Sequence, residues 1–166
     1  SFHSNATSMG DGEEEDEDSS LRDLLCVTSD QRLLLYSLEE EKLQMTHQLV
    51  GSNGEVTDLC FVGEGQNKVA LATASESIRI LHTSSLQCSC TCVGHTDVVL
   101  ALNSSTVDGV PVIVSGSKDR RVRVWNGNTA KCLGVGEGHS AAVSAVALSN
   151  KNSSRKLFAV SGSGDR

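Results

Sequence analysis

The sequence has few aromatic residues, a single proline and no long hydrophobic run. Aromatic residues make up 3% of its 166 residues, Pro111 is the only proline, and hydrophobic residues of all kinds reach 38%. Because a membrane-spanning helix needs about 18 or more apolar residues in a row, no membrane span is predicted. Apolar residues do not recur at helical spacing over any useful window, so helices are not predicted either. The apolar fraction is still sufficient for the core of one ordinary domain.

The chain also lacks an excess of basic residues. Its formal net charge is -7, and seven acidic residues stand in one block between Asp11 and Asp18, outside which acids and bases are equal in number. A run of like charges repels itself and stays solvated, so residues 1–23 are predicted to be a disordered acidic linker or insertion, and residues 24–166 the folded part. The alternative role for the block is a docking site for a basic partner. The sequence predicts no strongly basic face, so direct binding of nucleic acid is not predicted.

Metal-ligand and disulfide patterns are weak, although the chain has six cysteines. Cys88, Cys90 and Cys92 are spaced two apart, which places them on one face of a strand rather than in a zinc-binding knuckle. His82 and His95 lie nearby but lack the usual spacing of zinc ligands. We therefore predict small buried thiols in a reducing compartment, and no metal site.

Self-similarity at a spacing of about 45 residues is the most informative feature. The segment Val114–Asp119 recurs as Val160–Asp165, 46 residues later, and Gly94-His95 recurs as Gly138-His139, 44 residues later. In the best-preserved copy, β-branched or alternating segments are separated by Gly, Asn, Ser and Asp turn signals. They predict four short strands, at residues 98–102, 110–114, 121–125 and 131–135.

A repeat of this length with a Gly-His pair and a closing tryptophan resembles the WD repeat of β-propeller proteins. The resemblance covers residues 24–166 and implies an all-β fold in which each repeat forms a four-stranded blade. These residues suffice for about three blades, whereas closed propellers have roughly four to eight. We therefore expect an incomplete propeller with partial first and last blades, and a sequence that is an internal piece of a longer protein.

The resemblance also implies a set of structural residues. In WD repeats a His, a Ser or Thr, an Asp and a Trp form a buried hydrogen-bonded tetrad that holds each blade together. By position, the resemblance assigns the tetrad to His95, Ser117, Asp119 and Trp125, and a partial tetrad to His139, Ser163 and Asp165. The preceding copy keeps only the hydroxyl, as Thr73, and has Ser52, Ser75 and Leu81 at the other three positions.

A Ser, a His and an Asp within reach of one another also raise the alternative of a hydrolase. A catalytic triad needs an exposed nucleophile and an oxyanion hole, and no Gly-x-Ser-x-Gly elbow accompanies Ser117. Residues 63–68 lack the spacing of a phosphate-binding loop. We therefore predict no enzyme, no catalytic residue and no cofactor.

The order of the repeats is similar to that in the WD-repeat proteins associated with U3 small nucleolar RNA. This resemblance implies a non-catalytic scaffold in ribosome biogenesis, a component of the small-subunit processome that assists processing of precursor ribosomal RNA in the nucleolus. The implied partners are other WD-repeat proteins of a processome subcomplex, with U3 and precursor ribosomal RNA bound through the assembly. Neither a membrane nor a small-molecule substrate is implied.

A generic WD-repeat adaptor, such as a ubiquitin-ligase substrate receptor or a signalling scaffold, is the alternative function. Receptors of that kind resemble WD repeats with Asp-x-Arg after the closing Trp-Asp pair, whereas Trp125 is followed by Asn126-Gly127-Asn128. The most basic loop of the chain carries Lys151, Arg155 and Lys156. These cations are predicted to lie in a solvated loop, with phosphate contacts to RNA as the alternative.

Overall fold

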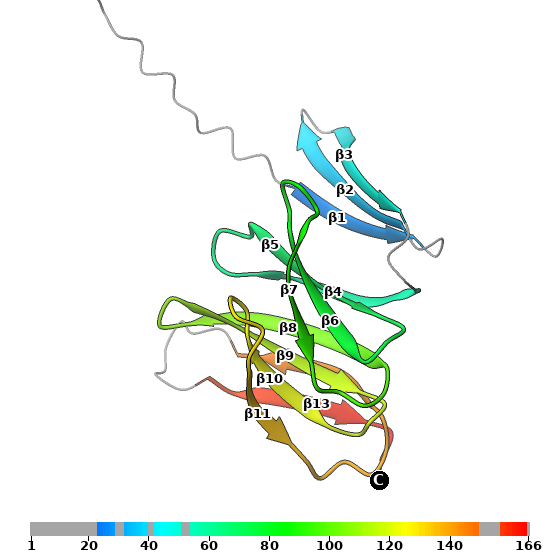
Figure 1. Cartoon of the computed structure of the whole chain (residues 1–166), viewed down its shortest axis with the longest axis vertical. Coiled ribbons are helices and arrows are strands. Elements are labelled where there is room, and N and C mark those ends of the chain that lie inside the picture. Colours follow the sequence, from blue (N-terminus) through cyan, green and yellow to red (C-terminus); the bar gives the residue numbers. More distant parts are fainter. Residues whose placement is uncertain (1–22, 29–31, 40–41, 51–53, 150–156, 166) are drawn as a thin grey trace, which may run out of the picture.

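The computed structural model describes residues 23–28, 32–39, 42–50, 54–149 and 157–165, and all regular structure in these ranges is β-strand. The strands form four antiparallel sheets. In Figure 1 the first three follow one another down the molecule in chain order, and the last pair packs against the third through β12. Among the described residues, no helix has the length and apolar character of a membrane span. The predicted all-β, incomplete propeller is confirmed.

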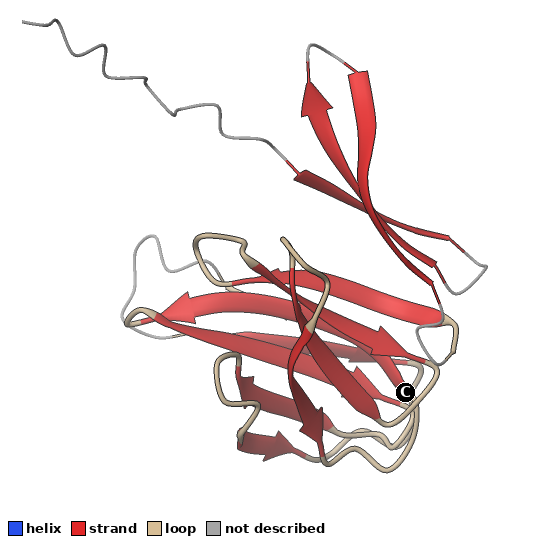
Figure 2. Ribbon diagram, turned by 45° about the horizontal axis from the view of Figure 1, so that its top comes forward, coloured by secondary structure: helices blue, strands red, loops and turns tan. Residues whose placement is uncertain are grey.

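Each sheet is built from strands that are neighbours in the sequence (Figure 2). The first blade comprises β1 (Asp23–Thr28), β2 (Arg32–Glu39) and β3 (Lys42–Val50). The second comprises β4 (Val56–Val62), β5 (Lys68–Thr73), β6 (Ser77–His82) and β7 (Cys88–Val93). The third comprises β8 (Val99–Val107), β9 (Val110–Ser117), β10 (Val122–Asn126) and β11 (Cys132–Gly136). The last pair is β12 (Val143–Leu148) and β13 (Ala159–Ser163).

The four strands predicted in the best-preserved repeat coincide with β8 to β11. The first two end later than predicted. β8 continues through polar residues to a tight turn at Asp108-Gly109, both with positive φ, and β9 continues past Val114 to Ser117. The last two begin one residue later than predicted and end one residue beyond the predicted end. Turn chemistry therefore located the connections well and the strand ends less well.

Neighbouring blades are joined along their first strands, β4, β8 and β12. The Asp58 carboxylate on β4 accepts a hydrogen bond from the backbone N–H of Leu102 on β8 at 2.6 Å. One repeat later, the Asn103 side chain on β8 accepts from the backbone N–H of Leu148 on β12 at 3.1 Å. The same polar link is thus repeated from blade to blade.

Two hydrophobic clusters lie between the blades, and both involve β5. Because side chains alternate along a strand, Val69 and Leu71 face the first blade while Ala70 and Ala72 face the third. The cluster toward the first blade consists of Leu33, Val69, Leu71, Leu81 and Leu86. The cluster toward the third blade consists of Val62, Ala70, Ala72, Ile78, Ile80, Cys92, Val99, Leu102, Ile113 and Trp125. Sheets buried on both faces explain why β5 is apolar at nearly every position.

Candidate functional site

A buried chain of hydrogen bonds crosses the third blade and joins four side chains. The Trp125 indole N–H donates to Ser115 Oγ at 2.8 Å, and Ser115 Oγ lies 2.8 Å from His95 Nε2. On the other side of the imidazole ring, His95 Nδ1 lies 2.7 Å from Asp119 Oδ2. The side chains of His95 and Asp119 are 0% and 2% exposed. These four residues form the tetrad of the third blade.

The protons of the tetrad follow from the hydrogen-bond capacity of each group. An indole N–H can only donate, and a carboxylate can only accept. With Nδ1–H donating to Asp119, the His95 Nε2 atom accepts from the Ser115 hydroxyl, and that hydroxyl accepts from Trp125. Burial lowers the pKa of His95 below its ordinary value, although the hydrogen bond to Asp119 opposes the shift. The neutral imidazole, which both donates and accepts, is therefore the form that the site holds.

Asp119 is held in its charged form by donors on three sides. Its Oδ2 accepts from His95 and from the backbone N–H of Thr96 at 3.1 Å, and its Oδ1 accepts from the backbone N–H of Arg121 at 2.9 Å. Burial raises the pKa of Asp119, but these hydrogen bonds outweigh it and the pKa lies below its ordinary value. The carboxylate thus ties the His95 loop to the turn between β9 and β10.

The structure corrects the hydroxyl of the predicted tetrad, which is Ser115 rather than Ser117. Both serines are buried on β9, but Trp125 pairs with Ile113 across β9 and β10, which puts Ser115 diagonally opposite the indole. Ser117 lies two residues farther along the strand, beyond reach of the indole. Its Oγ instead donates to the Asp97 carbonyl at 2.9 Å and accepts from the Asp119 N–H at 3.1 Å.

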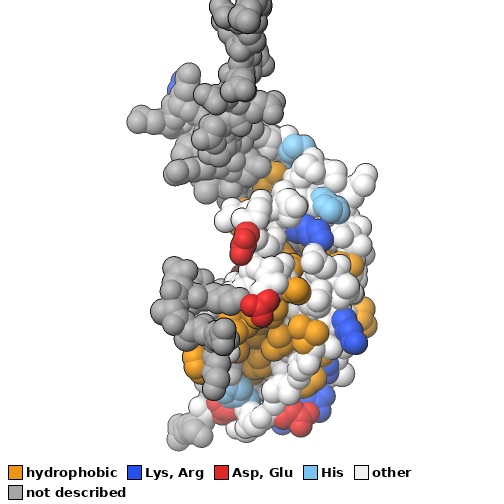
Figure 3. Space-filling view, turned by 90° about the vertical axis from the view of Figure 1, so that its left-hand side faces the viewer, with side chains coloured by type: hydrophobic (Ala, Val, Ile, Leu, Met, Phe, Trp, Pro, Cys, Tyr) orange, Lys and Arg blue, Asp and Glu red, His pale blue; other side chains and the backbone are white. Residues whose placement is uncertain are grey.

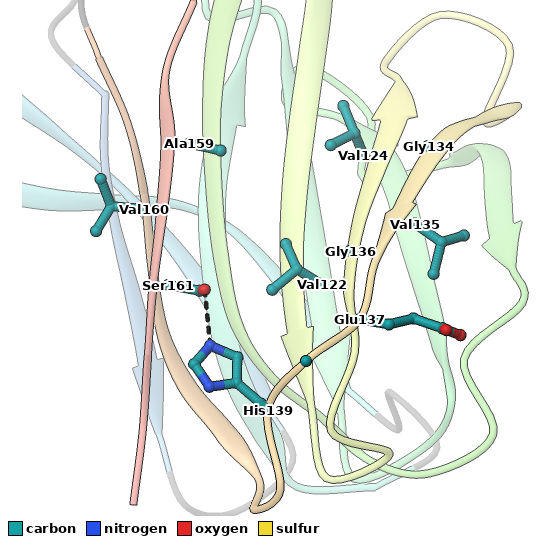
Figure 4. Close-up of a pocket in the computed structure, with 11 residues that line it drawn as sticks. Val122, Val124, Gly134, Val135, Gly136, Glu137, His139, Ala159, Val160 and Ser161 are labelled. Carbon is teal, nitrogen blue, oxygen red and sulfur yellow. Dashed lines mark hydrogen bonds between the residues drawn. The ribbon is translucent and has the colours of Figure 1, made fainter. Parts of the chain in front are cut away.

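The last pair repeats three of the four tetrad positions, with the same correction. His139 Nδ1 lies 2.9 Å from Asp165 Oδ2. His139 Nε2 lies 2.9 Å from Ser161 Oγ (Figure 4), so the hydroxyl partner is Ser161 and not Ser163. Ser163 Oγ accepts from the Asp165 N–H at 3.4 Å and so has the turn role of Ser117. Hydrogen bonds from the Ser140 N–H and from His139 hold the pKa of Asp165 below its ordinary value.

The second blade replaces the tetrad by apolar packing. Leu71 and Leu81 stand at the Ser115 and Trp125 positions, and both are fully buried in the cluster toward the first blade. Thr73, predicted to be the surviving tetrad hydroxyl, has the turn position of Ser117 instead and lies 3.0 Å from the Ser75 hydroxyl. Sequence reasoning missed Leu71 because it took Ser117 for the tetrad hydroxyl, so that Thr73 and not Leu71 stood at the equivalent position in this blade.

A comparison with known protein families agrees with this geometry. The family model described as "WD domain, G-beta repeat" matches residues 86–126 and 130–166, which extend from β7, the last strand of the second blade, through the third blade to β13. The chain contains WD repeats.

Several curated proteins are similar to this WD-repeat chain over much of its length. Transducin beta-like protein 3 of Mus musculus is 34% identical over 145 residues, covering 86% of this chain and 17% of the mouse protein. U3 small nucleolar RNA-associated protein 13 of Saccharomyces cerevisiae is 35% identical over 145 residues, covering 76% of this chain and 18% of the yeast protein. The chain therefore spans less than a fifth of the length of these relatives.

The cysteines of the WD-repeat chain are partly as predicted. The described cysteines are free thiols; Cys92 is buried, and burial raises the pKa of Cys60 and of Cys92 to about 12. Cys88, predicted to be buried with its neighbours, is exposed. The pairing of β6 with β7 shifts between Ile80, which pairs with Cys90, and Leu81, which pairs with Cys88, so the extra residue Ser89 breaks the alternation between the two cysteines.

The predicted RNA-contact residues of the WD-repeat chain, Lys151, Arg155 and Lys156, lie outside the described residues. Within the described ranges, no three His, Cys, Asp or Glu side chains gather in a way that could hold a metal ion. The tetrad is thus the main polar arrangement that the described blades bury.

Proposed function

We propose that this chain is part of a non-catalytic scaffold in ribosome biogenesis, acting in the small-subunit processome of the nucleolus. The observation that carries the proposal is the similarity to U3 small nucleolar RNA-associated protein 13, which extends over 76% of the chain. The name of that relative states an association with U3 small nucleolar RNA. On this proposal, other WD-repeat proteins of a processome subcomplex are the direct partners.

The chemistry of the tetrad supports a scaffold rather than a hydrolase. Ser115, the only hydroxyl in reach of His95 Nε2 among the described residues, is 0% exposed and already accepts the indole N–H of Trp125. A nucleophile must reach its substrate, and this oxygen is enclosed by its partners. The Ser-His-Asp combination therefore stabilises the blade instead of attacking a substrate.

Binding is assigned to the loops that the rigid blades present. Loops on a rigid scaffold are where recognition concentrates, because their variation does not disturb the core. In the sequence, Lys151, Arg155 and Lys156 lie between β12 and β13. We assign them to phosphate contacts with RNA inside the assembly.

The test is precipitation of the epitope-tagged full-length protein from cells, followed by measurement of bound U3 and precursor ribosomal RNA. Strong enrichment of both over an unrelated nucleolar protein is the expected result. Recovery of the protein without either RNA would refute the processome role and favour a general WD-repeat adaptor.

A matched pair of variants separates direct RNA contact from contact through partners. One full-length variant reverses Lys151, Arg155 and Lys156 to Glu, and the control reverses the exposed cations Lys118, Arg120 and Lys131. We expect the first variant to lose RNA while it keeps its protein partners, and the control to keep both. Equal RNA recovery with the two variants would overturn the assignment of these three cations and leave the scaffold role standing.

A further inference from the structure

Three thiols face the seam between the second and third blades, which is the packed contact between two four-stranded sheets. Cys90 and Cys92 on β7 pair with two isoleucines of β6, and those isoleucines belong to the cluster toward the third blade. Cys132 on β11 pairs with Trp125, which belongs to the same cluster. Because residues paired across two strands lie on the same face of a sheet, all three thiols point into this seam.

Solvent reaches these thiols to different degrees. Cys92 is buried, whereas Cys90 and Cys132 are partly exposed. Figure 3, in which cysteine has the colour of the hydrophobic residues, shows such side chains gathered over the lower half of one face, with Lys and Arg side chains beside them. A thiol reacts only where a reagent can reach its sulfur, so Cys90 and Cys132 are the reachable thiols of the seam.

One cation enters the seam next to Cys132. The Nη1 atom of Arg123 lies 3.8 Å from Cys132 Sγ, and its guanidinium carbon lies 5.9 Å from the centre of the Trp125 ring. On the other side of the seam, a Cβ placed on Gly94 would lie 3.1 Å from the same Nη1 atom. The guanidinium group thus lies among the indole, the glycine and the thiol.

The same guanidinium group has an unused donor. Arg123 Nε is buried, and among the described residues no acceptor lies within hydrogen-bond distance of it. Leaving a buried donor unpaired costs free energy, and the cost is greater on a charged group. The N–H groups of arginine form a planar fork that fits a carboxylate. The seam therefore offers a place for an anionic group within reach of the Cys132 sulfur.

We propose that Cys132 is a modification site, which forms a mixed disulfide with glutathione while Arg123 binds a carboxylate of the attached peptide. The step is thiol–disulfide exchange, with glutathione disulfide as the oxidant. The Cys132 thiolate attacks one sulfur of that disulfide, a new S–S bond forms and the old S–S bond breaks. The second glutathione leaves as a thiolate and takes up the proton that Cys132 lost. An excess of reduced glutathione reverses the step.

The other described cysteines each lack either access or the cation. Burial raises the pKa of Cys60 and of Cys92 to about 12, so both stay protonated at neutral pH. Cys88 and Cys90 can be reached, but their sulfurs lie next to hydroxyl and carbonyl oxygens rather than a guanidinium group. We therefore expect Cys132 to react first, Cys88 and Cys90 more slowly, and the two buried thiols last.

The experiment treats the purified full-length protein with glutathione disulfide and blocks the remaining thiols with iodoacetamide. Peptide mass spectrometry then measures the modified fraction of each cysteine over time. We expect Cys132 to be modified about fivefold faster than Cys88, because only Cys132 has a cation beside its sulfur. In protein unfolded with urea this preference should disappear, because it depends on the packed seam.

A pair of variants separates carboxylate binding from packing. Arg123→Gln removes the charge, and Arg79→Gln at the equivalent position of β6 is the matched control. We expect Arg123→Gln to slow modification of Cys132 about three- to tenfold, the value of one hydrogen bond, and the control to leave the rate unchanged. With the uncharged reagent hydroxyethyl disulfide the two variants should differ much less, because that reagent has no carboxylate to bind.

The proposal fails if Cys132 and Cys88 react equally fast in the folded protein, or if Cys90 is modified before Cys132. It also fails if Arg123→Gln has no effect, or slows the reaction equally with both reagents, since equal slowing indicates a change in packing alone. A disulfide between Cys132 and another cysteine, with no glutathione retained, would likewise refute it. None of these results bears on the RNA precipitation that tests the proposed function.

Discussion

Replacing Ser115 by alanine should be among the most damaging single-atom changes in the third blade. The substitution removes only Oγ, which accepts the Trp125 indole N–H at 2.8 Å and lies 2.8 Å from His95 Nε2. The indole N–H of Trp125 and the Nε2 atom of His95 are then left buried without that partner. Because each of these two unsatisfied buried polar groups costs about 1–3 kcal/mol, we expect the free energy of unfolding to fall by about 2–6 kcal/mol.

Ser117→Ala is the matched control, since it makes the same chemical change two residues away on the same strand. Ser117 Oγ holds the turn through Asp97 and Asp119 but does not contact the indole. Ser117 is also buried, but the groups that lose it are backbone groups of a turn whose residues Lys118 and Arg120 are exposed, so the cost should be smaller than at Ser115. We expect a loss of about 1 kcal/mol, the net value of one ordinary hydrogen bond.

The assay is urea unfolding followed by tryptophan fluorescence. Trp125 is the only tryptophan in the sequence and is 1% exposed, so its emission reports directly on the tetrad. Ser115→Ala should alter the emission of the native state as well as the midpoint, whereas Ser117→Ala should move the midpoint alone. A larger loss for Ser117→Ala, together with an unchanged native emission for Ser115→Ala, would refute the assignment of the hydroxyl.

Two further predictions concern packing and pH. Gly116→Ala is expected to destabilise the chain by about 1–3 kcal/mol, because its Cβ would lie 2.7 Å from a Val143 methyl group. The control Gly134→Ala, whose Cβ would have no atom within 4 Å, should cost little. Similar urea midpoints for the two variants would contradict the packing argument. Stability should also fall on acidification, because the pKa values of His95 and Asp119 are both lowered in the folded state and the unfolded chain therefore binds more protons. The loss of stability should begin near pH 6.5, where an unfolded His titrates, and steepen below about pH 4 as unfolded Asp takes up protons. If a His95→Gln variant keeps the same slope of unfolding free energy against pH between pH 6.5 and 5, His95 is excluded as the source of that slope.

The sequence predicted the architecture because the determinants of a repeat are local. Alternating apolar residues and Gly-Asn-Asp turns recur every 44 to 46 residues, and each copy specifies its own strands. For the same reason Asp119 and Trp125 could be placed in the tetrad, since each stands at a marked position next to a turn or at the end of the Val-Arg-Val-Trp segment. Their partner hydroxyl could not be chosen, because Ser115 and Ser117 share one face of β9 and both precede Asp119.

The pairing between β9 and β10 decides which of those two serines belongs to the tetrad. The pairing of Trp125 with Ile113 sets which hydroxyl lies diagonal to the indole, and that register is a property of the folded sheet. A bulge in β7 likewise exposes Cys88, although a two-residue spacing places it with Cys90 and Cys92.

The sequence by itself therefore determined the strands, the repeat and the family of this protein, because hydrophobic alternation and turn residues act over a few positions. Only the tertiary structure decided which hydroxyl completes the tetrad and how apolar Leu71 and Leu81 replace it in the second blade. Each of these depends on which residues meet across strands and between blades. Such contacts join positions far apart in the chain, and they exist only when the sheets are packed together.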